Sequence, residues 1–320
     1  MSRRKSLPDA AQKGIFTAED ALAGGVTRHQ LRLPEMTVPS RGLRINSAFE
    51  SDARQVLAVY STITPDTYVS HTSAAQAWGM WLERRHESTC PVHLTRVAGR
   101  GAAPRRKGVV GHTAPLTKED VRSFDALRLT SAEWTWTDLA ALGLDVRELV
   151  VAGDSLLQRG DGPNRRSGPL GRHPVSSVER LSAVLARRGR IPGAVAARKA
   201  LAMMRPGVDS RPESILRQLI VEAGYPEPLV NRPVSRPGGA TILPDLQYRE
   251  LRIAIQYEGA HHSELVQLGK DINRDFAYES LGWIVVRADK AIFTANGRAR
   301  FLDRLEHAFE KRRQISGESA

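Results

Sequence analysis

The last third of the chain constrains the fold most, because helix patterns there enclose several strand patterns. Segment 211–225 repeats apolar residues at helical spacing, and a second amphipathic helix is expected near 297–313. Between them, three segments alternate or run apolar as strands do: 241–250, 251–259 and 282–288. A further helix, approximately 264–281, separates the last two strands. This order predicts a compact α/β unit with a central mixed sheet.

Composition excludes several classes of protein. The 320 residues include one cysteine, Cys90, which can form neither an intrachain disulfide nor a cysteine-based zinc site. No run of about 18 apolar residues exists, and the basic N-terminus lacks the apolar core of a signal peptide. We therefore expect a cytoplasmic protein with no membrane partner.

The net charge of +12 is unevenly distributed. Residues 1–204 carry 30 Lys and Arg against 19 Asp and Glu, whereas residues 205–320 carry 17 against 16. A basic composition throughout the chain would not produce this asymmetry. The first two thirds are therefore predicted to meet a polyanion, and nucleic acid is the expected partner.

Three regions follow from the pattern along the chain. Residues 1–50 contain two short helix patterns joined by a glycine turn and followed by a strand, as in a winged helix-turn-helix. Residues 51–204 are predicted to form a middle α/β-helical module, with a Gly-, Pro- and Arg-rich flexible loop near 159–174. Residues 205–320 form the C-terminal α/β unit. The fold class is thus α/β and multidomain.

Acidic and amide side chains converge in the C-terminal strand patterns. Asp245 follows a proline at the start of one strand, and Gln256 and Glu258 lie two apart on the next, which places them on one face. Glu213, near the start of the preceding helix, can point to the same place. Carboxylate and amide oxygens suit a hard cation such as Mg²⁺, which can polarise a phosphate and supply hydroxide.

The C-terminal segments resemble a known family. RPESILRQL, Pro244–Asp245, YEGAHH and KDINRDFAYESLGWIVVR occur in the order seen in the PD-(D/E)xK nuclease superfamily, and more closely in its DUF559 branch, which is similar to very-short-patch repair endonucleases. The resemblance covers about residues 205–310. It implies a restriction-endonuclease-like domain that hydrolyses DNA phosphodiesters with Mg²⁺ or Mn²⁺.

The resemblance also implies roles for individual residues. Asp245 would be the principal metal ligand, with Glu258 and Gln256 completing the shell and Glu213 supporting it. His262 or His261 would carry a proton near the scissile phosphate. Two departures stand out: Gln256 replaces an acid, and Glu258 occupies the orthodox lysine position. Lys270 and Lys290 are candidates for the missing cation.

The N-terminal segments FTAEDALAGGVTRHQL, HTSAAQAWGM and LTSAEWTWTDLAA resemble AbiEi-like antitoxin proteins, in which a winged helix-turn-helix precedes a second α/β module. This resemblance implies a recognition helix that faces the major groove and a wing that meets phosphates. A basic loop at 100–107 could follow a phosphate backbone, and Arg274 could touch it from the C-terminal domain. The candidate nucleic-acid-binding residues are Thr27, Arg28, His29, Arg32, Arg41, Arg44, Arg105, Arg106, Lys107 and Arg274.

Two interpretations follow, and a third is weaker. The first is a DNA-binding protein with a metal-dependent endonuclease-like domain that cleaves or nicks DNA. The alternative is a non-catalytic, antitoxin-like transcriptional regulator that carries a decayed nuclease fold, with a cognate toxin or a second copy of the chain as partner. The third is a structure-specific RNA or nucleic-acid binder without sequence choice. His71 and His112 have no metal partners at sequence spacing and are interpreted as cap or core-edge residues.

Overall fold

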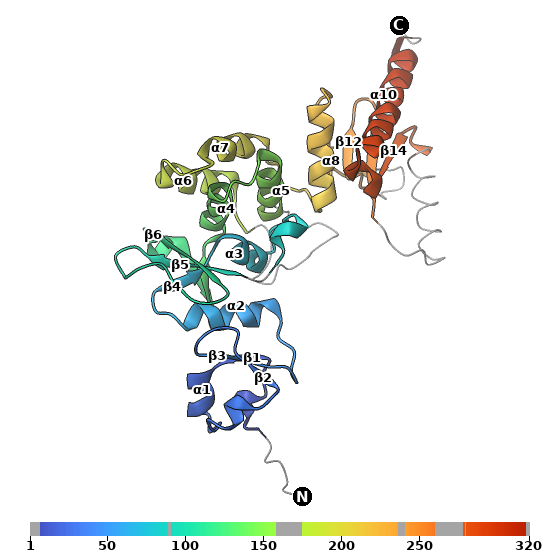
Figure 1. Cartoon of the computed structure of the whole chain (residues 1–320). Helices are drawn as coiled ribbons and strands as arrows, with labels where there is room; N and C mark the ends of the chain where they lie inside the picture. Colours follow the sequence, from blue (N-terminus) through green and yellow to red (C-terminus); the bar gives the residue numbers. More distant parts are fainter. Residues whose placement is uncertain are drawn as a thin grey trace, which may run out of the picture. The chain divides into compact units, whose positions relative to one another are not determined.

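A computed structural model of the chain describes residues 7–88, 91–157, 175–235, 241–259, 278 and 280–317 (Figure 1). Contacts between residues divide it into two compact units. The first contains the described residues up to Leu156 together with 175–203, and the second contains Leu157 and those from Met204 onward. No helix within these described ranges is long and apolar enough to cross a membrane. Both units combine helices with sheets, so the chain is mixed α/β with several sheets.

The first unit begins with a small antiparallel sheet in the order β1-β3-β2. Thr17 ends β1 and caps helix α1 by accepting a hydrogen bond from the Asp20 backbone. Apolar residues such as Phe16, Leu31 and Met36 form a local core beneath it. Its elements are η1 (Asp9–Ala11), β1 (Ile15–Thr17), α1 (Ala18–Ala23), η2 (Gln30–Arg32), β2 (Met36–Thr37) and β3 (Leu43–Asn46).

The second helix of the expected helix-turn-helix differs from the prediction. The segment after Gly25 forms only the 3₁₀ turn η2, and Thr27 and Gln30 exchange hydrogen bonds at its start. Leu33 is already extended, and Pro34 follows it. Pro34 disfavours the helical conformation at Leu33, and this ends the turn.

A five-stranded mixed sheet in the order β6-β5-β4-β8-β7 follows in the same unit. β5 pairs with β6 in parallel and with β4 antiparallel, while β4 pairs with β8 in parallel. Helix α2 contacts β4, β5 and β8, and helix α3 contacts β5. The bounds are α2 (Ala53–Thr62), β4 (Thr67–Val69), α3 (His71–Trp78), η3 (Arg84–His86), β5 (Val92–Val97), β6 (Val109–Ala114), η4 (Lys118–Asp120), β7 (Val121–Phe124) and β8 (Leu127–Thr130).

Four helices complete the first unit: α4 (Ala132–Ala141), α5 (Val146–Leu156), α6 (Val178–Arg188) and α7 (Ala194–Met203). α4 is buried along almost its whole length and contacts α3, α5, α6 and α7. Trp134 and Trp136 are buried in its core. The sequence from Asp138 onward has an uninterrupted helix-like pattern, but the structure divides it between α4 and α5, where Gly143 adopts a positive φ of 88°.

The second unit is built on a four-stranded sheet in the order β14-β13-β12-β9. β9, β12 and β13 pair antiparallel, and β14 returns parallel to β13. Helix α8 precedes the sheet and α10 follows it, with α10 in contact with β14. The bounds are α8 (Arg211–Glu222), β9 (Leu229–Val230), β10 (Val234–Ser235), β11 (Thr241–Ile242), β12 (Leu246–Tyr248), β13 (Ile253–Glu258), β14 (Ile284–Asp289), η5 (Lys290–Phe293) and α10 (Ala295–Gly317).

Candidate functional site

Asp245, Gln256 and Glu258 lie at the same end of adjacent strands in the second unit. Leu246 pairs with Ile255, so Asp245, one residue earlier, lies next to Gln256 on β13. The Asp245 carboxylate accepts a hydrogen bond of 2.6 Å from the backbone N–H of Tyr257. This bond fixes Asp245 against β13, and the hairpin predicted from the sequence forms.

Gln256 is almost fully buried and its amide nitrogen is engaged. Nε2 donates a hydrogen bond of 2.7 Å to the hydroxyl of Tyr278 and a longer one to the carbonyl of Leu243. The amide oxygen is then the atom that Gln256 has available as a ligand, and it brings no charge. The neutral side chain suits this buried position, because a carboxylate there would lose its hydration.

Glu258 is about half exposed and forms an ion pair with Arg287, 2.5 Å from Oε1 to Nε. Gln256 is in register with Arg287 on β14 and Glu258 with Asp289, so these side chains share one face of the sheet. Arg287 therefore places a positive charge beside Glu258. Lys290, one of the two lysines considered for the missing cation, lies in η5, which follows β14.

Glu213 is buried near the N-terminus of α8 and is held by three hydrogen bonds. It accepts from Ser210 Oγ (2.7 Å), the Asp209 backbone (3.0 Å) and Asn231 Nδ2 (3.0 Å). Burial raises the pKa of its carboxyl, although these three donors oppose the shift. Glu213 is thus anchored locally.

Asn231 connects Glu213 with the strand that carries Asp245. Its side chain donates to Glu213, and its backbone N–H donates to the carbonyl of Asp245 over 2.9 Å. Asn231 has a positive φ of 43°, which asparagine tolerates better than most residues. The sequence carries no signal that marks Asn231, since asparagine is common in turns.

The remaining C-terminal candidates, His261, His262 and Arg274, lie outside the described residues, as does Lys270. Among the acids that the structure describes, Glu213, Asp245 and Glu258 do not form a group of three converging ligand atoms. The structure thus brings Asp245, Gln256 and Glu258 to one sheet edge but leaves Glu213 with its own partners.

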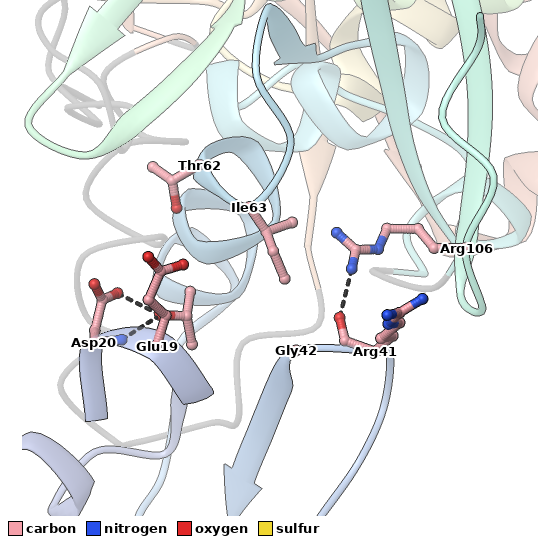
Figure 2. Close-up of a pocket in the computed structure, with 8 residues that line it drawn as sticks. Glu19, Asp20, Arg41, Gly42, Thr62, Ile63 and Arg106 are labelled. Atoms are coloured by element: carbon pink, nitrogen blue, oxygen red, sulfur yellow. Dashed lines mark hydrogen bonds between the residues drawn. The ribbon is translucent and has the colours of Figure 1, made fainter. Parts of the chain in front are cut away.

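The N-terminal candidates are mostly exposed, and two segments of them meet. Arg106, in the basic loop, donates hydrogen bonds to the backbone carbonyl of Arg41 and to Thr64. Figure 2 shows Arg106 reaching toward Arg41 beside a shallow pocket, with Glu19 and Asp20 across from it. This contact brings the loop before β3 and the basic loop together.

Exposure separates these candidates into two groups. Arg44 is half-buried and donates to the carbonyls of Leu31 and Leu43. Arg106 donates to Arg41 and Thr64, so both side chains hold the local fold together. The exposed candidates are Thr27, Arg28, His29, Arg32, Arg41, Arg105 and Lys107.

Three histidines that sequence analysis did not connect meet in the first unit: His71 at the start of α3, His93 on β5 and His112 on β6. One ring nitrogen from each lies within 4.8 Å of the others. The rings are stacked, with centroids of His71 and His112 3.7 Å apart, and His93 Nδ1 lies 3.0 Å from His112 Nε2. The interpretation of His71 and His112 as separate cap or core-edge residues misses this convergence.

The electrostatics keep these imidazoles neutral. Burial, reinforced by the neighbouring histidines, lowers the pKa of His71 to about 2, and burial lowers that of His93 to about 4. The pKa of His112 is lowered as well, again by burial. A neutral imidazole keeps a lone pair on one ring nitrogen.

No family model matches the chain. Two curated relatives, the uncharacterized proteins MT2308 and Rv2248 from the Mycobacterium tuberculosis strains CDC 1551/Oshkosh and ATCC 25618/H37Rv, are each 31% identical over 106 residues. The match covers 33% of this chain and 39% of each relative. The similarity therefore extends over about two fifths of the relatives' length, and their names describe no activity.

Proposed function

We propose that this protein binds DNA through its first unit and carries an endonuclease-like domain, acting on DNA phosphodiesters, in its second. The observation that carries the proposal is the adjacency of Asp245, Gln256 and Glu258 at one end of β12 and β13. They lie in a sheet of three antiparallel strands with a fourth returning in parallel, preceded by α8. This order supports the resemblance to the PD-(D/E)xK superfamily and its DUF559 branch.

The donor set at this edge suits Mg²⁺ or Mn²⁺. Mg²⁺ is commonly held by one or two carboxylates and completes its shell with water and substrate phosphates. The Asp245 carboxylate and the Gln256 amide oxygen are such hard donors, whereas Glu258 is paired with Arg287 and is the weaker ligand. When bound, the ion would polarise the phosphate and supply a hydroxide.

The chain's own residues would position the substrate. Tyr257 N–H holds the Asp245 carboxylate, and Asn231 ties its backbone to the segment around Glu213. Arg287 would supply the cation that the sequence lacks at the orthodox lysine position, facing a phosphate from the strand next to Gln256. His261 or His262 would protonate or position the leaving group.

DNA binding is supported by the charge distribution and by one contact. The hydrogen bond from Arg106 to the Arg41 carbonyl joins two basic loops, so the exposed Arg41, Arg105 and Lys107 belong to one part of the surface. Arg28, His29 and Arg32 are exposed around η2. Phosphate contacts of this kind give affinity without reading sequence.

Plasmid cleavage tests the catalytic part. We expect purified full-length protein to nick or cut supercoiled plasmid in Mg²⁺ or Mn²⁺. Asp245→Asn should slow cleavage more than about 100-fold, because even outer-shell changes at metal sites cost about 10- to 100-fold. Asp303→Asn, the same change at an exposed acid on α10, should leave the rate unchanged. Cleavage that persists in Asp245→Asn would overturn the assignment of the site.

The second candidate is a non-catalytic DNA-binding regulator, with a cognate toxin or a second copy of the chain as partner. It is favoured by the contacts of Gln256 with Tyr278 and of Glu258 with Arg287, which engage two of the three proposed ligands. This candidate predicts salt-sensitive, sequence-specific DNA binding and no cleavage with any divalent ion. The same plasmid assay, combined with a binding assay, separates the two.

A further inference from the structure

We propose that His71, His93 and His112 form a binding site for one divalent transition metal ion, of the kind that Zn²⁺ represents. The three side chains come from α3, β5 and β6, and one ring nitrogen of each lies within 4.8 Å of the other two. Within the residues that the structure describes, no other group of three His, Cys, Asp or Glu ligands converges in this way. This site is independent of the proposed function of the second unit.

The sheet brings two of the ligands together. β5 and β6 are parallel neighbours with Thr95 opposite His112, so His93 and His112 lie two positions apart on one face (Figure 1). α3 contacts β5 and begins at His71, which carries the third ring to this face. The three positions are thus fixed by a helix start and two hydrogen-bonded strands, which are rigid supports for a metal site.

His71 is held in an uncommon conformation by groups that orient its ring. Its φ is +53°, and it is buried at the first position of α3. Its Nδ1 lies 2.9 Å from Ser70 Oγ and 3.5 Å from Asp138 Oδ2. A carboxylate facing the non-ligating nitrogen of a histidine is the usual outer shell of a metal site, because it fixes the ring and strengthens the ligand.

Asp138 is itself fully buried and anchored. Arg188 Nη1 donates to it over 2.7 Å, and the guanidinium of Arg188 lies 4.2 Å from the centroid of Trp134. The other oxygen of Asp138, Oδ2, faces His71 Nδ1 over 3.5 Å. The carboxylate therefore faces the ring of His71 from a position that Arg188 fixes.

The ligand chemistry selects the class of metal. Imidazole nitrogen suits Zn²⁺, Cu²⁺, Ni²⁺ or Fe²⁺, whereas Mg²⁺ and Ca²⁺ require oxygen donors. A tetrahedral Zn²⁺ with bonds of about 2.0–2.1 Å separates its nitrogen ligands by roughly 3.4 Å. His93 and His112 are 3.0 Å apart at their nearest nitrogens, and both are half-exposed, so their rings have room to rotate into that geometry.

Three histidines leave a fourth position for solvent or another small ligand, as in zinc sites with three protein ligands. The half-exposed rings of His93 and His112 place that position toward the solvent side, while His71 closes the buried side. The competing explanation is a purely structural stack of neutral imidazoles joined by the hydrogen bond between His93 and His112. That explanation predicts no metal binding.

Metal titration of the full-length protein distinguishes the two. After removal of metal with a chelator, we expect equilibrium dialysis to return one Zn²⁺ per chain, and Co²⁺ to give visible absorption bands. His93→Gln and His112→Gln should each weaken Zn²⁺ binding more than about 100-fold, since each removes a ligand outright. His307→Gln, at an exposed histidine on α10, and Asp245→Asn should bind Zn²⁺ at this site as the unaltered protein does.

Folding is controlled for by choosing the half-exposed strand histidines rather than the buried His71 and by recording far-ultraviolet circular dichroism. A second measurement uses the unaltered protein: Zn²⁺ should raise its unfolding temperature in a concentration-dependent way, because the ion binds the folded state. Absence of stoichiometric Zn²⁺ binding and of this rise would overturn the proposal, as would retention of binding in both glutamine variants. If Asp245→Asn still binds Zn²⁺, whatever its effect on plasmid cleavage, the histidine site is separate from the proposed nuclease site.

Discussion

At the scale of single residues, Asp120 shows how a buried charge joins two parts of the first unit. It is fully buried in η4, where Arg187 of α6 donates two hydrogen bonds to it and Thr117 donates from both backbone and side chain. Burial by itself would raise the pKa of Asp120, but these donors outweigh burial and hold the pKa below its ordinary value. Asp120 is therefore ionised in the folded protein and ties α6 to the strand region.

We expect Asp120→Asn to lower the free energy of unfolding near neutral pH by about 1.5–3 kcal/mol, because a charged hydrogen-bonded pair is lost. Since the folded pKa of Asp120 is depressed, its contribution is complete above the unfolded value of about 3.9 and is lost as pH falls through the folded pKa. The difference between the proteins should thus shrink at acidic pH.

Urea unfolding followed by tryptophan fluorescence between pH 3 and 7 measures this difference. Asp125→Asn is the matched control, because Asp125 pairs with Arg54 while 93% of its side chain is exposed. Little change is expected there, as for exposed ion pairs generally. An Asp120→Asn effect that stayed constant down to pH 3 would show that hydrogen bonding alone, and not ionisation, supports this contact.

At the scale of elements, the start of α8 links helix stability to the candidate site. Ser210 caps the helix by accepting from the Glu213 backbone over 3.3 Å, and its hydroxyl donates to the Glu213 side chain. Pro212 follows in the first turn, where its missing N–H costs nothing. One serine thus serves both the helix terminus and the buried carboxylate.

Ser210→Ala should destabilise the second unit by about 1–2 kcal/mol, since it removes the cap and one donor from a buried carboxylate. Hydrogen exchange measured by mass spectrometry should show faster exchange in the first turns of α8. Ser177→Ala removes the cap of α6, where Ser177 accepts from Arg180, and should speed exchange in α6 instead. Unchanged protection of α8 in Ser210→Ala would contradict the role given to this serine.

At the scale of the whole molecule, the two units differ in charge as well as in fold. The excess of positive charge lies before residue 205, and residues 205–320 are nearly neutral. Electrostatic affinity for a polyanion depends on the number of phosphates neutralised, so the proposed DNA contacts belong mainly to the first unit. The second unit would then contribute catalysis more than binding affinity.

The salt dependence of DNA affinity tests this division. The logarithm of the binding constant should fall linearly with the logarithm of salt concentration, with a slope of about −0.9 for each phosphate contact. The double variant Arg105→Gln, Lys107→Gln should make the slope less negative by about 1.8, since both residues are exposed in the basic loop. Fluorescence anisotropy with a labelled duplex at several salt concentrations gives the slope.

The matched control removes two exposed positive charges from the second unit. Arg300→Gln combined with Lys311→Gln on α10 changes net charge equally and should leave the slope unchanged. If both pairs altered the slope to the same extent, general charge rather than a defined surface would account for binding.

Local sequence patterns predicted many elements but not their ends. The helix predicted over 211–225 is α8, and the strands predicted over 241–250 and 251–259 contain β12 and β13. Thr27 accepts a hydrogen bond from the Gln30 backbone, yet the α-helix predicted in this segment is a 3₁₀ turn. Propensity and spacing are local quantities, and a segment that ends at a proline after one turn gives them too few residues to act on.

The candidate site follows the same division between local and tertiary information. Hairpin pairing and the two-residue period follow from neighbouring residues, so local pattern was enough to predict Asp245, Gln256 and Glu258 at one sheet edge. The hydrogen bond from Gln256 to Tyr278, the ion pair of Arg287 with Glu258 and the convergence of His71, His93 and His112 could be found only in the folded chain. Those contacts depend on which strands become neighbours and how a helix packs on them, and such long-range pairing leaves no periodic signal along the chain.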